Sequence, residues 1–98
     1  MTRPSGIDAE ELLGSRGRIR VLQVLAESSE LNISEVGRRT GMNYTSVERH
    51  LKALTGMGLI REKRYGKIRI FEALFNAINV RFDRDRGVRV EVDADSSG

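Results

Sequence analysis

The chain of 98 residues has no cysteine and only one histidine. The lack of cysteine excludes a disulfide framework, a thiolate metal site, a cysteine nucleophile and a thiol redox switch. One histidine leaves no histidine-based triad and no histidine metal cluster. Neither paired carboxylates nor a glycine-rich phosphate loop stands at an interpretable spacing. We therefore expect a protein that is not an enzyme and that needs no metal and no cofactor.

Long hydrophobic runs are also missing. No apolar stretch approaches the ~20 residues of a membrane-spanning helix, and the first six residues lead into acidic residues rather than into an apolar core. With 39% hydrophobic and 32% charged residues, the composition is typical of a globular protein, and we expect it in the cytoplasm. A domain of this length buries little surface alone, which makes a homodimer the expected state.

The net charge of +3 conceals an uneven distribution. From Arg16 to Arg69 there are twelve basic and five acidic residues, a net charge of +7, whereas the flanks together carry −4. A strongly basic segment between acidic ends indicates a polyanionic partner. The cations are mostly arginine, which suits bidentate phosphate contacts, although genome composition or a hot habitat produces the same bias.

Hydrophobic periodicity predicts a short helix over 7–13, stopped by Gly14, and a longer one from an N-cap at Ser15 to about Glu27. In the longer helix, one predicted core face carries Ile19, Leu22, Leu25 and Ala26. Val21 and Val24 lie on the opposite face. A helix that is apolar on two sides must be covered twice, so the second face needs another element or another subunit.

A short extended piece at 31–33 precedes two more predicted helices. Ser34 is the expected cap of a helix over 35–40, and Gly41 supplies the turn to a helix that starts near Asn43. In this last helix the core face carries Val47, Leu51 and Leu54, and the opposite face carries Thr45, Arg49 and Lys52.

Two β-hairpins complete the pattern. Strands over 59–65 and 68–73, with Gly66 at the tip, form a basic hairpin. Alternation then predicts a second hairpin around a turn at 83–87, in which Phe82 pairs with Val88, Val80 with Val90 and Ile78 with Val92. All six side chains share one face, and a two-stranded hairpin needs that face covered, either by another part of the same chain or by a second chain.

The order helix, short strand, helix, glycine turn, helix and hairpin is that of a winged helix-turn-helix. The run from Ser34 to Leu54, followed by Gly58-Leu59-Ile60, resembles the ArsR and MarR transcription regulators. The resemblance covers roughly 15–71 and implies an α+β fold, a three-helix core plus a β-hairpin wing with an additional C-terminal hairpin. The expected layout is a tail and short helix at 1–14, the winged helix-turn-helix at 15–75, a candidate dimerisation hairpin at 76–93 and a disordered tail at 94–98.

The resemblance also implies which residues meet double-stranded DNA. The recognition helix, about 44–55, would present Tyr44, Thr45, Ser46, Glu48, Arg49 and Lys52 to the major groove. The wing, 61–70, would place Arg64, Lys67 and Arg69 on the phosphate backbone or in the minor groove. Further backbone contacts are expected from Arg38 and Arg39 in the second helix and from Arg16 and Arg18 in the first.

The sequence departs from these relatives in three ways. It lacks the cysteine or clustered histidine ligands of their metal-sensing members. Gly37 stands where such motifs usually carry alanine, which we interpret as keeping a helix crossing close. In place of a long terminal dimerisation helix stands the second hairpin, so the expected dimer surface consists of Val21 and Val24 together with Ile78, Val80, Phe82, Val88, Val90 and Val92.

Each of these residues also has an interpretation in which it does not contact DNA. Arg49 and Lys52 fit a solvated helix face in which Glu48 and Lys52 form an i, i+4 ion pair. Tyr44 fits a packed position, a basic wing fits protection against edge aggregation, and His50 fits a packed histidine. The leading hypothesis is a homodimeric, sequence-specific DNA-binding transcription regulator. The alternative is a winged-helix module for protein interaction or architectural nucleic-acid binding.

Overall fold

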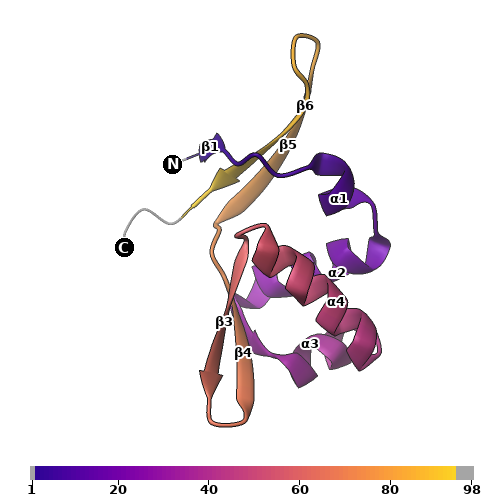
Figure 1. The fold of residues 1–98 in the computed structure, drawn as a ribbon, viewed down its shortest axis with the longest axis vertical. Coiled ribbons are helices and arrows are strands. Elements are labelled where there is room, and N and C mark those ends of the chain that lie inside the picture. Colours follow the sequence, from indigo (N-terminus) through magenta and orange to yellow (C-terminus); the bar gives the residue numbers. More distant parts are fainter. Residues whose placement is uncertain (1, 95–98) are drawn as a thin grey trace.

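The computed structural model describes residues 2–94, in which four helices lie beside two antiparallel sheets of three strands each (Figure 1). The acidic tail predicted for 94–98 lies, apart from Ala94, outside the described residues. The elements are β1 (Thr2–Pro4), α1 (Ala9–Leu13), α2 (Arg16–Ser28), β2 (Glu30–Asn32), α3 (Ile33–Thr40), α4 (Tyr44–Gly56), β3 (Ile60–Tyr65), β4 (Ile68–Ala73), β5 (Ala77–Asp83) and β6 (Gly87–Asp93).

The helix starts are fixed by side-chain caps. The predicted cap Ser15 is confirmed, since its hydroxyl accepts the amide of Arg18 at 3.3 Å. Asn43 caps α4 in the same way. The cap predicted at Ser34 is wrong, because Asn32 is the last extended residue and its Oδ1 accepts the amide of Glu35 at 2.8 Å. An Asx side chain satisfies an amide that has no partner within the helix.

The core of the winged helix-turn-helix is where α2, α3 and α4 meet strand β4. Val47, Leu51 and Leu54 of α4 are fully buried, which confirms the predicted core face of that helix. Across from them lie further fully buried side chains, including Leu25 and Val36. The antiparallel sheet of order β2-β4-β3 adds Phe71, so the sheet's hairpin is anchored at its base and free at its tip.

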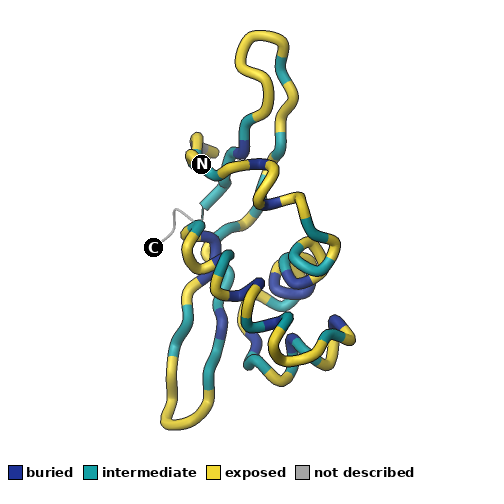
Figure 2. Tube along the Cα trace, turned by 45° about the vertical axis from the view of Figure 1, so that its right-hand side comes forward, coloured by how far each residue is buried: buried dark blue, intermediate teal, exposed yellow. Residues whose placement is uncertain are grey.

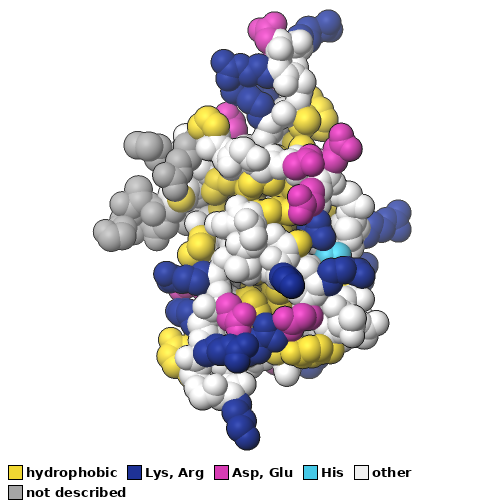
Figure 3. All heavy atoms as spheres, viewed as in Figure 1, with side chains coloured by type: hydrophobic (Ala, Val, Ile, Leu, Met, Phe, Trp, Pro, Cys, Tyr) yellow, Lys and Arg dark blue, Asp and Glu magenta, His cyan; other side chains and the backbone are white. Residues whose placement is uncertain are grey.

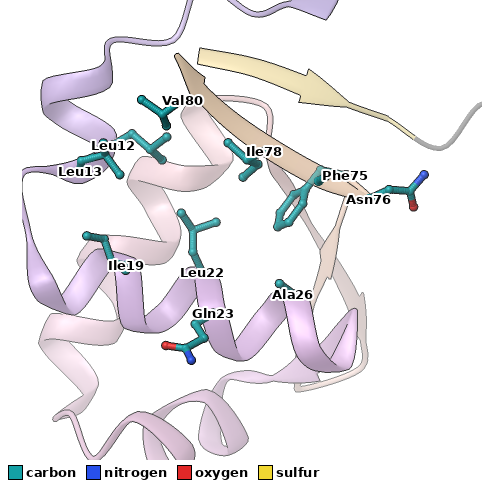
Figure 4. A pocket seen from close by; sticks show the side chains of 11 residues that line it. Leu12, Leu13, Ile19, Leu22, Gln23, Ala26, Phe75, Asn76, Ile78 and Val80 are labelled. Atoms are coloured by element: carbon teal, nitrogen blue, oxygen red, sulfur yellow. The ribbon is translucent and has the colours of Figure 1, made fainter. Parts of the chain in front are cut away.

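The structure corrects the face assignment of α2 in part, since Leu25 of the predicted core face is fully buried as expected but other residues of that face are not. Val21 and Val24 are 0% and 8% exposed, because this side of α2 belongs to the core that the helix shares with α3 and α4. Ile19, predicted to be core, is 41% exposed. Figure 4 shows Ile19, Leu22 and Ala26 on the side of α2 that faces the second hairpin. Val21 and Val24 are therefore unavailable to a second chain.

The second sheet has the order β1-β6-β5. Its predicted register is confirmed, with Phe82 opposite Val88, Val80 opposite Val90 and Ile78 opposite Val92. Where the sequence predicted only a tail, Thr2–Pro4 forms β1 against β6. Val90 is 3% exposed and lies in the same buried cluster as Ala9 and Leu12 of α1, so it too is a core residue and not a free surface.

The outer end of this hairpin is uncovered. Phe82 is 80% exposed and Val88 is 39% exposed, although both belong to the apolar face. Figure 2 shows that the tips of the two hairpins are exposed at opposite ends of the molecule, whose longest dimension is 46 Å. One hairpin is the wing and the other reaches away from it. None of the helices within 2–94 is long and apolar enough to span a membrane.

Candidate nucleic-acid interface

Helix α4 divides into a buried and an exposed side. Val47, His50, Leu51 and Leu54 are buried, while Thr45, Arg49 and Lys52 are exposed on the other side, as the periodicity predicted. Tyr44, in the first turn, is 59% exposed and is not packed beneath the helix. A helix held by one face with polar and basic groups on the other can enter a groove of DNA.

The β3–β4 hairpin forms the wing, and its tip turns at Gly66 with φ 63°. Arg64 and Lys67, at the end of β3 and in the turn, are exposed. Figure 3 shows Lys and Arg side chains interleaved with acidic ones over the lower end of the molecule, where the wing and α4 lie. The surface is therefore not uniformly basic, and the positions of its carboxylates matter.

The side chain of Arg69 joins α4 to both strands of the wing. Its Nη1 and Nη2 donate to the two oxygens of Glu48 on α4 at 2.6 and 2.8 Å. Its Nε donates to Glu62 on β3 at 2.9 Å, and Nη1 also donates to the Tyr44 hydroxyl at 3.0 Å. The guanidinium carbon stands 5.4 Å from the centre of the Phe71 ring. Only 19% of the Arg69 side chain is exposed.

The titration of this cluster follows from its contacts. Hydrogen bonds to Arg69 hold the pKa of both Glu48 and Glu62 below the usual value, against the opposing effect of burial. The two carboxylates in turn raise the pKa of Arg69. All three groups are therefore charged at neutral pH. Arg69, predicted as a phosphate contact, has its donors committed within the protein.

The ion pairs formed by the carboxylates also determine which basic side chains remain without a partner. Glu48 bonds to Arg69 and makes no ion pair with Lys52, so the i, i+4 pair considered from the sequence is wrong. Within residues 2–94, Arg16, Arg49, Lys52 and Lys67 have neither a hydrogen bond nor an ion pair through their side chains. Arg64 is paired with Glu62 at 2.9 Å but keeps 66% of its side chain exposed.

The remaining predicted backbone contacts lie outside α4 and the wing. Arg38 and Arg39 bond to Glu35 on α3, and Arg38 keeps the pKa of that carboxyl low. Arg39 also donates to the Ser28 hydroxyl at 2.6 Å. Arg18 donates to the backbone oxygen of Glu11 at 2.6 Å. Arg38 and Arg39 remain exposed, whereas Arg18 is half-buried.

The lone histidine is packed between α2 and α4. His50 is 3% exposed, and a Cβ added at Gly17 would stand 2.8 Å from its Nε2 and 2.9 Å from Cε of Met42. Gly17 therefore sets the close approach of the two helices. A Cβ at Gly37 would meet only the Met42 oxygen, at 3.6 Å, so the close crossing assigned to Gly37 from the sequence is wrong.

Sequence reasoning missed two features of this site, namely the Arg69 cluster and the role of Gly17. A signal for the first was present, since Glu62 is the lone carboxylate in a strand of cations and Glu48 stands on the recognition face. No group of three or more His, Cys, Asp or Glu side chains among residues 2–94 could hold a metal ion.

Comparison with protein families bears on the helix-turn-helix segment that carries this surface. Residues 15–62 match the family model described as "Bacterial regulatory protein, arsR family", from the cap of α2 to the start of the wing. The match covers just under half of the chain and shows that this segment is similar to that family, and the chain is a winged helix-turn-helix transcription regulator. Comparison with curated proteins gave no match.

Proposed function

We propose that the protein binds a specific sequence of double-stranded DNA as a homodimer, in the cytoplasm. In this proposal α4 lies in the major groove and the wing lies on the backbone or in the minor groove. The observation that carries it is the exposed side of α4, where Thr45, Arg49 and Lys52 are exposed opposite a fully buried core face. Recognition helices use such a face to reach base edges.

The contacts inside the protein separate the residues at the exposed side of α4 into two groups, those that orient the surface and those that can contact DNA. Tyr44 and Glu48 are tied to Arg69, which supports a role in orienting the surface. Thr45, Ser46, Arg49 and Lys52 are the groups we assign to the DNA. Arg49 suits a bidentate contact to a guanine edge, and Lys52 suits a base or a phosphate oxygen. Thr45 and Ser46 offer hydroxyls to a base edge or the backbone.

Phosphate contacts would come from both ends of this face. Lys67 has no partner among the described residues and Arg64 is largely exposed, so both can reach a phosphate from the wing. Arg16, Arg18, Arg38 and Arg39 would flank α4 on the other side. Such contacts fix the register on the duplex and carry no sequence information themselves.

Selection from random duplex DNA, followed by gel shift with the enriched sequence, tests this function. We expect a palindromic site whose half-sites lie one helical turn, ~34–36 Å, apart, as two recognition helices of a dimer require. An enriched single half-site would contradict the dimer, and recovery of unenriched sequence with salt-dependent binding would favour the architectural alternative.

A further inference from the structure

An apolar groove on the surface of the molecule takes no part in the DNA-binding face. It lies between α1, α2 and β5 and has a volume of about 470 Å³. Figure 4 shows its walls, which consist mainly of hydrophobic side chains, among them Leu13, Ile19, Leu22, Phe75, Ile78 and Val80. The polar lining residues are the amides Gln23 and Asn76, and none of the charged side chains that the structure describes lines it. None of the lining residues comes from α3, α4 or the wing.

Phe82 stands beyond the end of this groove on the same apolar face of β5. It is 80% exposed, and its cross-strand partner Val88 is 39% exposed. A second, smaller hollow of about 330 Å³ lies between Phe82 and Ala9, Leu13 and Gly14, with Glu10 as its one charged lining residue among those described. Leu13 lines both hollows, so one apolar strip runs from Phe75 along β5 to Phe82. An exposed aromatic side chain at the end of an apolar strip marks an interaction surface.

Strand β5, which carries much of the strip, lies at the edge of its sheet. In the sheet of order β1-β6-β5, β5 pairs on one side only among residues 2–94 and is an edge strand of the described sheet. Charged residues often protect such an edge, and β5 carries Arg81 and Asp83 toward its outer end, whereas its apolar face carries none. Here the edge strand forms one wall of the apolar groove.

We propose that a second copy of the chain covers this strip, with Phe82 of each copy inserted into the groove of the other. The inference rests on the proposed homodimer and names its surface. A two-fold contact is reciprocal, so each copy supplies one aromatic side chain and one groove that receives it. A small apolar ligand would fill the groove but would leave Phe82 and Val88 in water, which is why the strip favours a second copy.

This surface replaces part of the one expected from the sequence. Val21, Val24 and Val90 are core residues of each copy, whereas Ile19 and Leu22 on the other side of α2 take their place. Because the strip includes neither α4 nor the wing, paired copies keep both recognition helices free.

The absence of cysteine makes a proximity test direct. Val88→Cys protein, in which the thiol stands next to an intact Phe82 across the strands, is mixed with Ile19→Cys protein and treated with a short bismaleimide cross-linker. We expect a cross-linked heterodimer. The matched control replaces Ile19→Cys with Ile68→Cys, a 54% exposed aliphatic position on the wing, and should give no heterodimer.

Sedimentation equilibrium then measures the energetic role of the side chain. Phe82→Asp should weaken self-association by about 30-fold or more, the loss expected for a central aromatic anchor. Ile68→Asp should leave it unchanged. Wild-type protein that stays monomeric at high micromolar concentration would overturn the proposal, as would a dimer that is unaffected by Phe82→Asp and gives no heterodimer with Ile19→Cys.

These measurements contain no DNA, so they fail separately from the proposed function. Phe82→Asp monomers should still bind an isolated half-site with the wild-type base preference. A dimer with the expected cross-link that binds no specific DNA would overturn the proposed function and leave the assigned surface standing.

Discussion

Arg69 and Glu48 form a two-pronged ion pair, in which Nη1 and Nη2 of the arginine donate to the two carboxylate oxygens at 2.6 and 2.8 Å. Arg69 belongs to the wing and Glu48 to the recognition helix, so the pair fixes one relative to the other. The planar geometry of two parallel hydrogen bonds adds direction as well as strength. Glu62 accepts from the third donor and ties in the neighbouring strand.

Replacing Arg69 by alanine should weaken operator binding by about tenfold or more, since a hydrogen bond to a charged group contributes ~1.5–3 kcal/mol and two carboxylates would then face the phosphates. Gel shift measures the loss. The triple variant Arg69→Ala/Glu48→Gln/Glu62→Gln should recover part of the affinity, because it removes the uncompensated charge. No recovery would mean that Arg69 contacts the DNA itself.

On the wing, Lys67→Ala should flatten the dependence of log affinity on log salt by about one unit, the effect of losing one phosphate contact. Arg64→Ala should flatten it less, because Arg64 is already paired with Glu62. Arg86→Ala, at the exposed tip of the other hairpin, is the matched control and should leave the slope unchanged. An unaltered slope in the Lys67 variant would place the wing away from DNA.

Replacement by alanine should have opposite effects on the stability of the fold at two helical glycines. Gly17→Ala forces a Cβ to within 2.8 Å of the His50 ring, so it should destabilise the fold by ~1–3 kcal/mol. Gly37→Ala meets ordinary contact and should stabilise by ~0.4–1 kcal/mol, because alanine restricts the unfolded chain. Chemical denaturation of the two variants checks both signs, and equal effects would contradict the assigned helix crossing.

The stability of the fold should fall as the pH drops below about 6.5, the ordinary value for histidine. Burial lowers the pKa of His50, with Arg18 and Arg49 adding to the effect, so the unfolded chain takes up the proton first. Thermal unfolding between pH 5 and pH 7.5 should therefore show a slope in wild type that is reduced in His50→Gln. Carboxylates with lowered pKa values act at lower pH. The same slope in both proteins would assign the effect elsewhere.

Much of the fold follows from local pattern. The cap at Ser15, the start of α4 near Asn43, the core face of α4 and the register of the second hairpin were predicted, and each depends on residues close together in the sequence. The core side of α2 did not follow, because both of its faces are apolar and periodicity does not say which one meets α3 and α4. Strand β1 escaped prediction because three residues form it only through pairing with β6.

Some features of the candidate site could likewise be predicted from the sequence, and others could not. The exposure of Thr45, Arg49 and Lys52 could be predicted, since it is the complement of a buried helical face. The partners of Arg69 could not, because they lie 7 and 21 positions away and meet only when the wing packs beside α4. Charge counted along the sequence therefore overstated the free cations on the wing.

The central claim is that the exposed side of α4 reads the DNA sequence. Its most direct test is the affinity of Arg49→Ala and Lys52→Ala for the selected operator and for unrelated duplex, with circular dichroism to verify the fold. Loss of a base-reading contact should cost ~1–3 kcal/mol on the operator and much less on unrelated DNA, whereas loss of a phosphate contact should weaken both alike. The account predicts the first pattern for Arg49→Ala and weaker operator binding for each variant. A double variant that binds the operator as tightly as wild type would contradict it.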